Sequence, residues 1–102
     1  MKVITMLCER IDDEICDARF YAKKAIKYEN EYPELANALH DLAAQEMDHM
    51  SILHKHVVRL IEAYRAKHGE PPENMMAVYN YLHERSIKKA ADVKRIMQMF
   101  RN

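Results

Sequence analysis

The chain alternates apolar and polar positions with a helical period over nearly its whole length. Apolar residues recur at spacings of three and four, the repeat that places side chains along one side of an α-helix. Only two short segments interrupt this pattern. We therefore predict three long helices, over residues of about 2–30, 33–68 and 72–101.

The two interruptions carry residues that begin and end helices. Pro33 suits the first position of a new helix, and Glu34 stabilises the positive end of its dipole. Gly69 is typical of the position after a helix end, and Pro71 prevents the helix from continuing. Because both connections are short, successive helices should run antiparallel. The predicted fold is all-α: a single domain over residues 1–102, an antiparallel three-helix bundle made of a helical hairpin plus a third long helix.

A helical wheel gives each predicted helix one apolar stripe, and we expect these stripes to form the core. The stripe of the first helix is Ile4, Leu7, Cys8, Ile11, Ile15, Ala18, Ala22, Ala25 and Ile26. That of the second is Leu35, Leu39, Leu42, Met50, Leu53, Val57, Leu60 and Tyr64, and that of the third is Met75, Tyr79, Leu82, Ala90, Val93, Met97 and Phe100. Other apolar residues lie off these stripes and are candidates for contact with a partner chain: Met6, Cys16, Phe20, Met47 and Val58.

Composition narrows the fold and the class of protein. One glycine in 102 residues argues against sandwiches, barrels and Rossmann-type sheets, which need glycine at tight turns and phosphate loops. Sixteen basic against 16 acidic residues argue against nucleic-acid binding, although the last third is mildly basic. No apolar run reaches the length of about 18 residues that suggests a membrane span, and the first residues do not form a signal peptide. We expect a cytoplasmic protein.

The two cysteines fit that expectation. Cys8 and Cys16 lie eight residues apart on one predicted helix, so their Cα atoms should be about 12 Å apart. That separation exceeds the limit of about 7 Å for a disulfide. We therefore expect two free thiols in a reducing compartment.

The most informative residues are polar ones inside the apolar stripes. Glu46 and His49 lie near the centre of the second stripe and, being three residues apart, have neighbouring side chains. Glu14 occupies a stripe position on the first helix. In an antiparallel hairpin that turns near residues 30–32, all three lie at the same height. Two carboxylates and an imidazole in an apolar shell are suitable ligands for iron, manganese or zinc. Tyr21, two turns from Glu14, is a candidate to hydrogen-bond one of these ligands without contacting the metal.

A purely structural interpretation of these residues stays open. Buried carboxylates avoid their desolvation cost by protonation or by pairing with a base. Glu14 and Glu46 would then be neutral or paired with a base such as Arg19 or Arg95, and His49 would be a hydrogen-bonded core histidine.

The remaining candidate ligands are weaker. Asp92 lies at the edge of the third stripe, near the height of Glu46, without a second Glu-x-x-His motif around it. His83 faces inward but far from the three ligands, where core packing explains it. His40 and His54 fall on the polar side of the second helix, and His56 lies at the edge of its stripe.

Two short motifs resemble the ferritin-like superfamily. The run from Glu14 to Tyr21 is similar to the rubrerythrin pattern of Glu followed seven residues later by Tyr, and Gln45-Glu46-Met47-Asp48-His49-Met50 resembles its Glu-x-x-His helix. The resemblance covers residues of about 5–65. It implies a half-site for non-haem iron, with Glu14, Glu46 and His49 as ligands, and a role in iron oxidation or peroxide scavenging.

This chain carries one half-site, whereas rubrerythrins and ferritins carry two. Encapsulated ferritins, which the predicted hairpin also resembles, pair two chains about a two-fold axis to complete the site. The resemblance therefore implies a homodimer or a larger even assembly. The chain has no rubredoxin-like Cys-x-x-Cys pair, so electron delivery of the rubrerythrin type is not encoded here. The alternative is a non-enzymatic helical-bundle protein for interaction or assembly, with a vestigial site, and whether the chain is an enzyme stays open.

Overall fold

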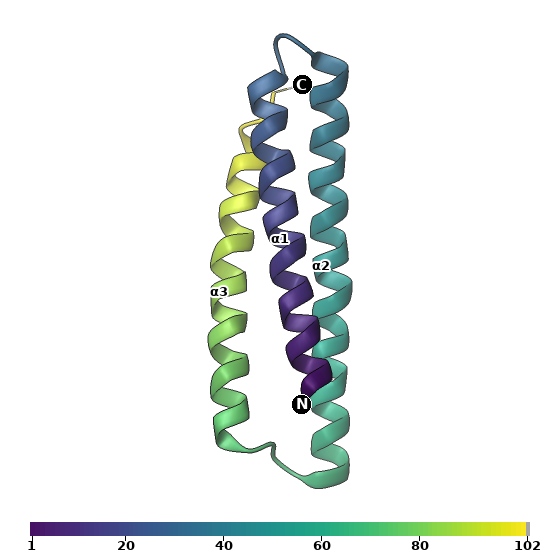
Figure 1. Ribbon diagram of the computed structural model, residues 1–102, viewed down its shortest axis with the longest axis vertical. Helices are drawn as coiled ribbons and strands as arrows, with labels where there is room; N and C mark the ends of the chain where they lie inside the picture. Colours follow the sequence, from purple (N-terminus) through teal and green to yellow (C-terminus); the bar gives the residue numbers. More distant parts are fainter. Residues whose placement is uncertain (102) are drawn as a thin grey trace.

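The computed structural model describes residues 1–101 as three antiparallel helices (Figure 1). Helix α1 spans Lys2–Tyr28, α2 spans Pro33–His68 and α3 spans Glu73–Gln98, and no strand occurs among residues 1–101. The predicted all-α bundle and both predicted breaks are confirmed. Helix α1 ends two residues before the predicted position, and α3 ends three residues before it.

The chain ends its helices for identifiable reasons. Gly69 adopts a φ of 81°, which favours glycine, while its N–H still donates to the Arg65 carbonyl at 2.9 Å. At the end of α3, the Phe100 N–H donates to the Met97 carbonyl at 3.2 Å in a tighter turn. The Phe100 ring stacks on His40 of α2, with ring centroids 4.5 Å apart. The chain thus leaves α3 through a tighter turn with Phe100 packed against α2.

Helix α1 is the shared element of the bundle. It packs along α2 on one side and along α3 on the other, whereas the backbones of α2 and α3 come close at few positions (Figure 1). The result is a rod of 56 × 18 × 18 Å. Its length matches the 36 residues of α2, which at about 1.5 Å per residue span about 54 Å.

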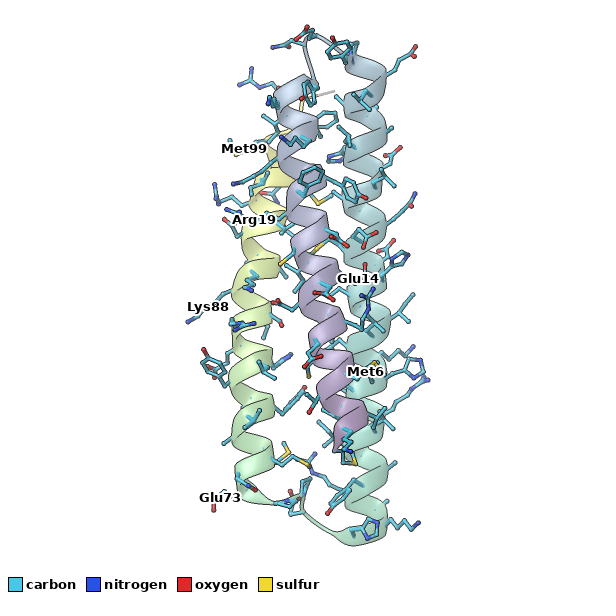
Figure 2. The ribbon with its side chains drawn as sticks, viewed as in Figure 1. Met6, Glu14, Arg19, Glu73, Lys88 and Met99 are labelled. Atoms are coloured by element: carbon cyan, nitrogen blue, oxygen red, sulfur yellow. The ribbon has the colours of Figure 1, made fainter. Side chains whose placement is uncertain are left out.

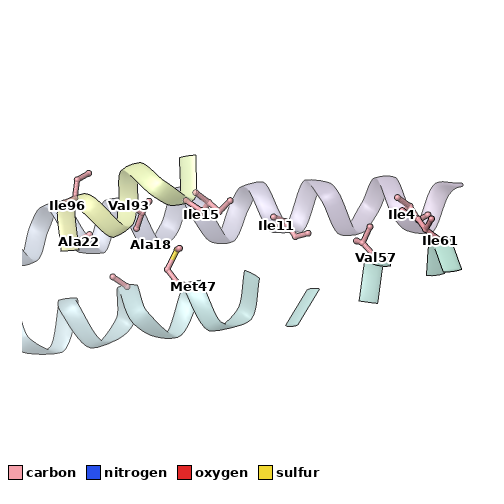
Figure 3. Close-up of a cluster of buried hydrophobic side chains, with 12 residues drawn as sticks. Ile4, Ile11, Ile15, Ala18, Ala22, Met47, Val57, Ile61, Val93 and Ile96 are labelled. Carbon is pink, nitrogen blue, oxygen red and sulfur yellow. The ribbon is translucent and has the colours of Figure 1, made fainter. Parts of the chain in front are cut away.

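Alanines line the close contact between α1 and α2. Ala18, Ala25, Ala36 and Ala43 have no exposed surface, and larger side chains fill the layer toward α3 (Figure 3). Because helix separation depends on the side chains at the contact, these alanines allow the two backbones to approach closely. The buried cluster comprises Ile4, Ile11, Ile15, Ala18, Ala22, Ala43, Met47, Val57, Ile61, Ala90, Val93 and Ile96.

The buried face of α2 is rotated about the helix axis relative to the predicted apolar stripe. Met47, which we placed outside the stripe, is buried and points toward Ile15 and Ala18 (Figure 3). Leu35 and Leu42, which we placed in the core, are 48% and 37% exposed. The cause is α3, which adds its apolar side chains on the Met47 side of the hairpin and leaves the other edge of the stripe uncovered.

Ion pairs fix α3 along α1. Lys89 donates to Asp12 at 2.8 Å, and Arg19 donates to Asp92 at 3.1 Å. The hydrogen bond from Lys89 is the main reason that the pKa of Asp12 lies below its usual value. These pairs set the register of the two parallel helices.

Replacing Ile15 with alanine should lower the free energy of unfolding by about 2–5 kcal/mol, because its side chain is 1% exposed and the neighbouring helices cannot close the cavity fully. Ile87→Ala is the matched control: Ile87 is 54% exposed, so its replacement should change stability by about 0.5 kcal/mol or less. Urea denaturation followed by circular dichroism measures both. Equal losses in the two variants would contradict the described core.

Candidate metal centre

The structure brings the three predicted ligand residues together between α1 and α2. Glu14, Glu46 and His49 each offer one ligand atom, and these atoms all lie within 4.8 Å of one another. His49 Nδ1 is 3.5 Å from Glu14 Oε2 and 3.9 Å from Glu46 Oε2. The two carboxylates and the imidazole therefore face a common point.

Helix geometry explains this convergence. Glu46 and His49 are three residues apart on α2 and project from neighbouring positions on its surface. Glu14 lies near the middle of α1, between the core residues Ile11 and Ala18. It meets Glu46 and His49 across the antiparallel contact. The position of the hairpin turn thus places the three side chains at the same level along the bundle, and the helical period turns them toward one another.

Glu14 is the buried member of the cluster, and its two oxygens have different surroundings. The residue is 8% exposed. Its Oε1 accepts a hydrogen bond from Arg10 at 3.1 Å, whereas Oε2 is buried without a hydrogen-bond partner among the described residues. A buried acceptor with no partner costs free energy, and a water molecule or an ion can satisfy it. Oε2 is the oxygen that faces His49.

The cluster is closed on the core side and open on the other. The side chains of Glu14 and Glu46 are 11% and 18% exposed, whereas that of His49 is 54% exposed. In Figure 2, Glu14 lies on α1 toward α2, and α3 runs along the other side of α1. A bound ion would therefore keep coordination positions that are accessible from outside this chain.

Helix α3 contributes nothing to the cluster. Asp92, the weak candidate ligand, instead accepts hydrogen bonds from Arg19 at 3.1 Å and from Arg95 at 2.6 Å. Glu14 therefore pairs with a base, as the structural alternative expects, but neither Arg19 nor Arg95 is that base. The base that pairs with Glu14 is Arg10, which we did not single out although it lies four residues before Glu14, a spacing at which helical side chains meet.

The role of Tyr21 as a hydrogen-bond partner of a ligand residue stays a prediction. It lies on α1 two turns beyond Glu14 and is half-buried against the core. Its ring meets Phe20 edge to face, with centroids 5.7 Å apart.

A second polar cluster, which the sequence analysis missed, joins α2 to α3. The rings of His54 and His83 stack with centroids 4.7 Å apart, and Tyr79 stacks on the other side of His83 at 5.6 Å. We placed His54 on the polar side of α2, but it is half-buried there and its Nε2 has no hydrogen-bond partner in the described part of the chain. These histidines border an apolar groove of about 360 Å³ between α2 and α3.

The chain matches no family model, no curated protein and no solved structure. None of the helices in residues 1–101 is both long and apolar enough to cross a membrane. Both cysteines are free thiols, as expected from their spacing. Function therefore has to be argued from the geometry and chemistry of the Glu14, Glu46 and His49 cluster.

Stability should fall as the pH drops below about 6.5, the pKa of an unfolded histidine. Burial, and secondarily the neighbouring His83, lowers the pKa of folded His54, so the unfolded chain binds a proton that the folded chain resists. His54→Gln should flatten the fall in melting temperature between pH 7 and pH 5. His56→Gln, at an exposed position of the same helix, serves as the control. An unchanged pH profile in His54→Gln would show that His54 does not contribute.

Proposed function

We propose that this protein is a ferritin-like non-haem metal-binding protein, with iron as the expected metal and manganese or zinc as alternatives. Glu14, Glu46 and His49 form the half-site, and a second copy of the chain completes it. The observation that carries the proposal is the buried Oε2 of Glu14, which has no hydrogen-bond partner among the described residues and faces an imidazole and a second carboxylate within 4.8 Å. The resemblance of the two motifs to rubrerythrin, which is carried by the same residues, agrees with it.

The donor set suits this class of metal. Carboxylate oxygens with a single imidazole favour iron, manganese or zinc, and two carboxylates neutralise most of the charge of a divalent ion. When bound, iron would supply oxidation chemistry toward oxygen or peroxide. The chain's own part is to hold Glu14 fixed in the core while the more exposed His49 adjusts to the ion.

A second copy of the chain is the natural source of further ligands. Three ligands are fewer than iron needs, and the open side of the half-site lies away from α3. That side also carries uncovered apolar side chains: Leu35 and Leu42 are exposed on α2, as is Met6 on α1. Pairing two such faces about a two-fold axis would bury these residues and bring two half-sites together in a four-helix arrangement.

Protein purified without chelator should contain about one metal ion per chain, and Glu46→Ala should abolish stoichiometric binding because it removes one of three ligands. Elemental analysis against protein concentration measures this. Glu84→Ala, which removes a carboxylate from α3, is the control and should retain the metal. A metal-free wild type after loading with Fe²⁺, Mn²⁺ or Zn²⁺ would overturn the proposal.

The stability of metal-free Glu46→Ala relative to the metal-free wild type should show whether Glu46 is a ligand. If Glu46 is a ligand, Glu46→Ala in chelator should be as stable as the wild type or more stable, because a mostly buried carboxylate facing another has gone. If the cluster is a structural network, the variant should instead lose about 1–3 kcal/mol through unsatisfied partners. Thermal melts in chelator distinguish these outcomes.

The wild type should form a homodimer or larger even assembly in solution, and Leu42→Glu should dissociate it by burying a charge in the apolar contact. Light scattering coupled to size exclusion measures the mass. Ile87→Glu, at an exposed apolar position of α3, should leave the assembly intact. Assembly without any bound metal would favour the alternative function, a helical module for protein assembly with a vestigial site.

A further inference from the structure

Arg10 lies next to the half-site, where its positive charge is close to the place of a bound cation. Its Nη2 donates to Glu14 Oε1 at 3.1 Å, and its Nη1 donates to Asp13 at 3.2 Å. Half of the Arg10 side chain is exposed, whereas the Glu14 side chain is 11% exposed. One oxygen of the buried carboxylate thus faces the ligand cluster, and the other is held by a guanidinium from the same helix.

The contact between Arg10 and Glu14 changes the charge balance of the cluster. Two glutamates bring two negative charges between α1 and α2 in a partly buried setting, where like charges are costly. Arg10 offsets one of them. A divalent ion at the cluster would sit beside the same Glu14 carboxylate and would experience repulsion from the guanidinium.

Building on the proposed function, we propose that Arg10 is the resident counter-ion of the metal-free half-site, and that a divalent metal ion competes with it for Glu14. Arg10 is a positioning residue and not a ligand, because guanidinium has no lone pair to give. Asp13 retains an acceptor for the guanidinium when the metal takes over the charge of Glu14. The arrangement sets the metal affinity below what Glu14, Glu46 and His49 alone would give.

An ordinary surface ion pair would not have this effect. Pairs four residues apart on a helix are common and contribute little to stability. They do not, however, share a mostly buried carboxylate with a ligand cluster. Arg95 provides the comparison: it donates to Asp92 three residues before it, at 2.6 Å, on α3 and outside the cluster.

The test is a Mn²⁺ titration of the full chain, in which the electron paramagnetic resonance signal of free Mn²⁺ reports binding without any assay of activity. Arg10→Gln should bind Mn²⁺ about three- to tenfold more tightly than the wild type, the change expected from removing one positive charge near a divalent ion. Arg10→Lys retains the charge and should stay within about twofold of the wild type. Arg95→Gln removes an equal charge on α3 and should not change the affinity.

The outcomes separate this inference from the proposed function. Mn²⁺ binding by the wild type with equal or weaker binding by Arg10→Gln would overturn the role of Arg10 and leave the metal site standing. Equal tightening in Arg95→Gln would show a general charge effect and also overturn it. Binding by neither the wild type nor Arg10→Gln would overturn both proposals, and binding by Arg10→Gln alone would show that Arg10 blocks the site. Circular dichroism of each variant confirms that the helices are retained.

Discussion

The close packing of α1 on α2 is the constraint on which the rest of the structure depends. Fully buried alanines on both helices remove the side-chain volume that would hold the backbones apart. At that separation the short reach of a glutamate is enough for Glu14 to meet His49 across the contact. Larger residues in place of Ala18 or Ala43 would overpack this contact, widen the hairpin and separate the ligand atoms.

Helix α1 also has to serve two neighbours with different sides of its surface. Asp12 and Arg19, which pair with α3, lie about 160° and 140° around the helix from Glu14. The third helix therefore stabilises the hairpin without covering the half-site. A chain with the same hairpin but with α3 on the opposite face would bury His49 and close the cluster to any partner.

Much of this arrangement can be predicted from one sequence. The prediction fails for the buried face of α2, and the reason is physical. Helical period, Pro33 and Gly69 predict the three helices, and the height rule for an antiparallel hairpin predicts that Glu14 meets Glu46 and His49. A helical wheel finds the centre of an apolar stripe but not which of its edges a third helix will cover. That missing choice explains why Met47 was placed outside the core and Leu42 inside it.

Two polar contacts were also missed, each for its own reason. Arg10 carries no apolar signal, and its role depends on which glutamate oxygen is left unpaired, a detail of side-chain rotation. The stacking of His54 on His83 depends on where α3 crosses the groove beside α2. Geometry between distant segments decides the second contact, whereas the first is a local pair at a spacing of four residues.

The rod shape restricts how such a protein can associate. A flank of 56 by 18 Å outlines about 1,000 Å², whereas an end of 18 by 18 Å outlines about 320 Å², and a specific interface needs about 800 Å² from each partner. Only side-by-side contact offers that much surface, so end-to-end filaments of this chain would be weak. Lateral pairing also makes the particle less elongated as it grows, so a dimer would tumble more nearly like a sphere than the monomer does.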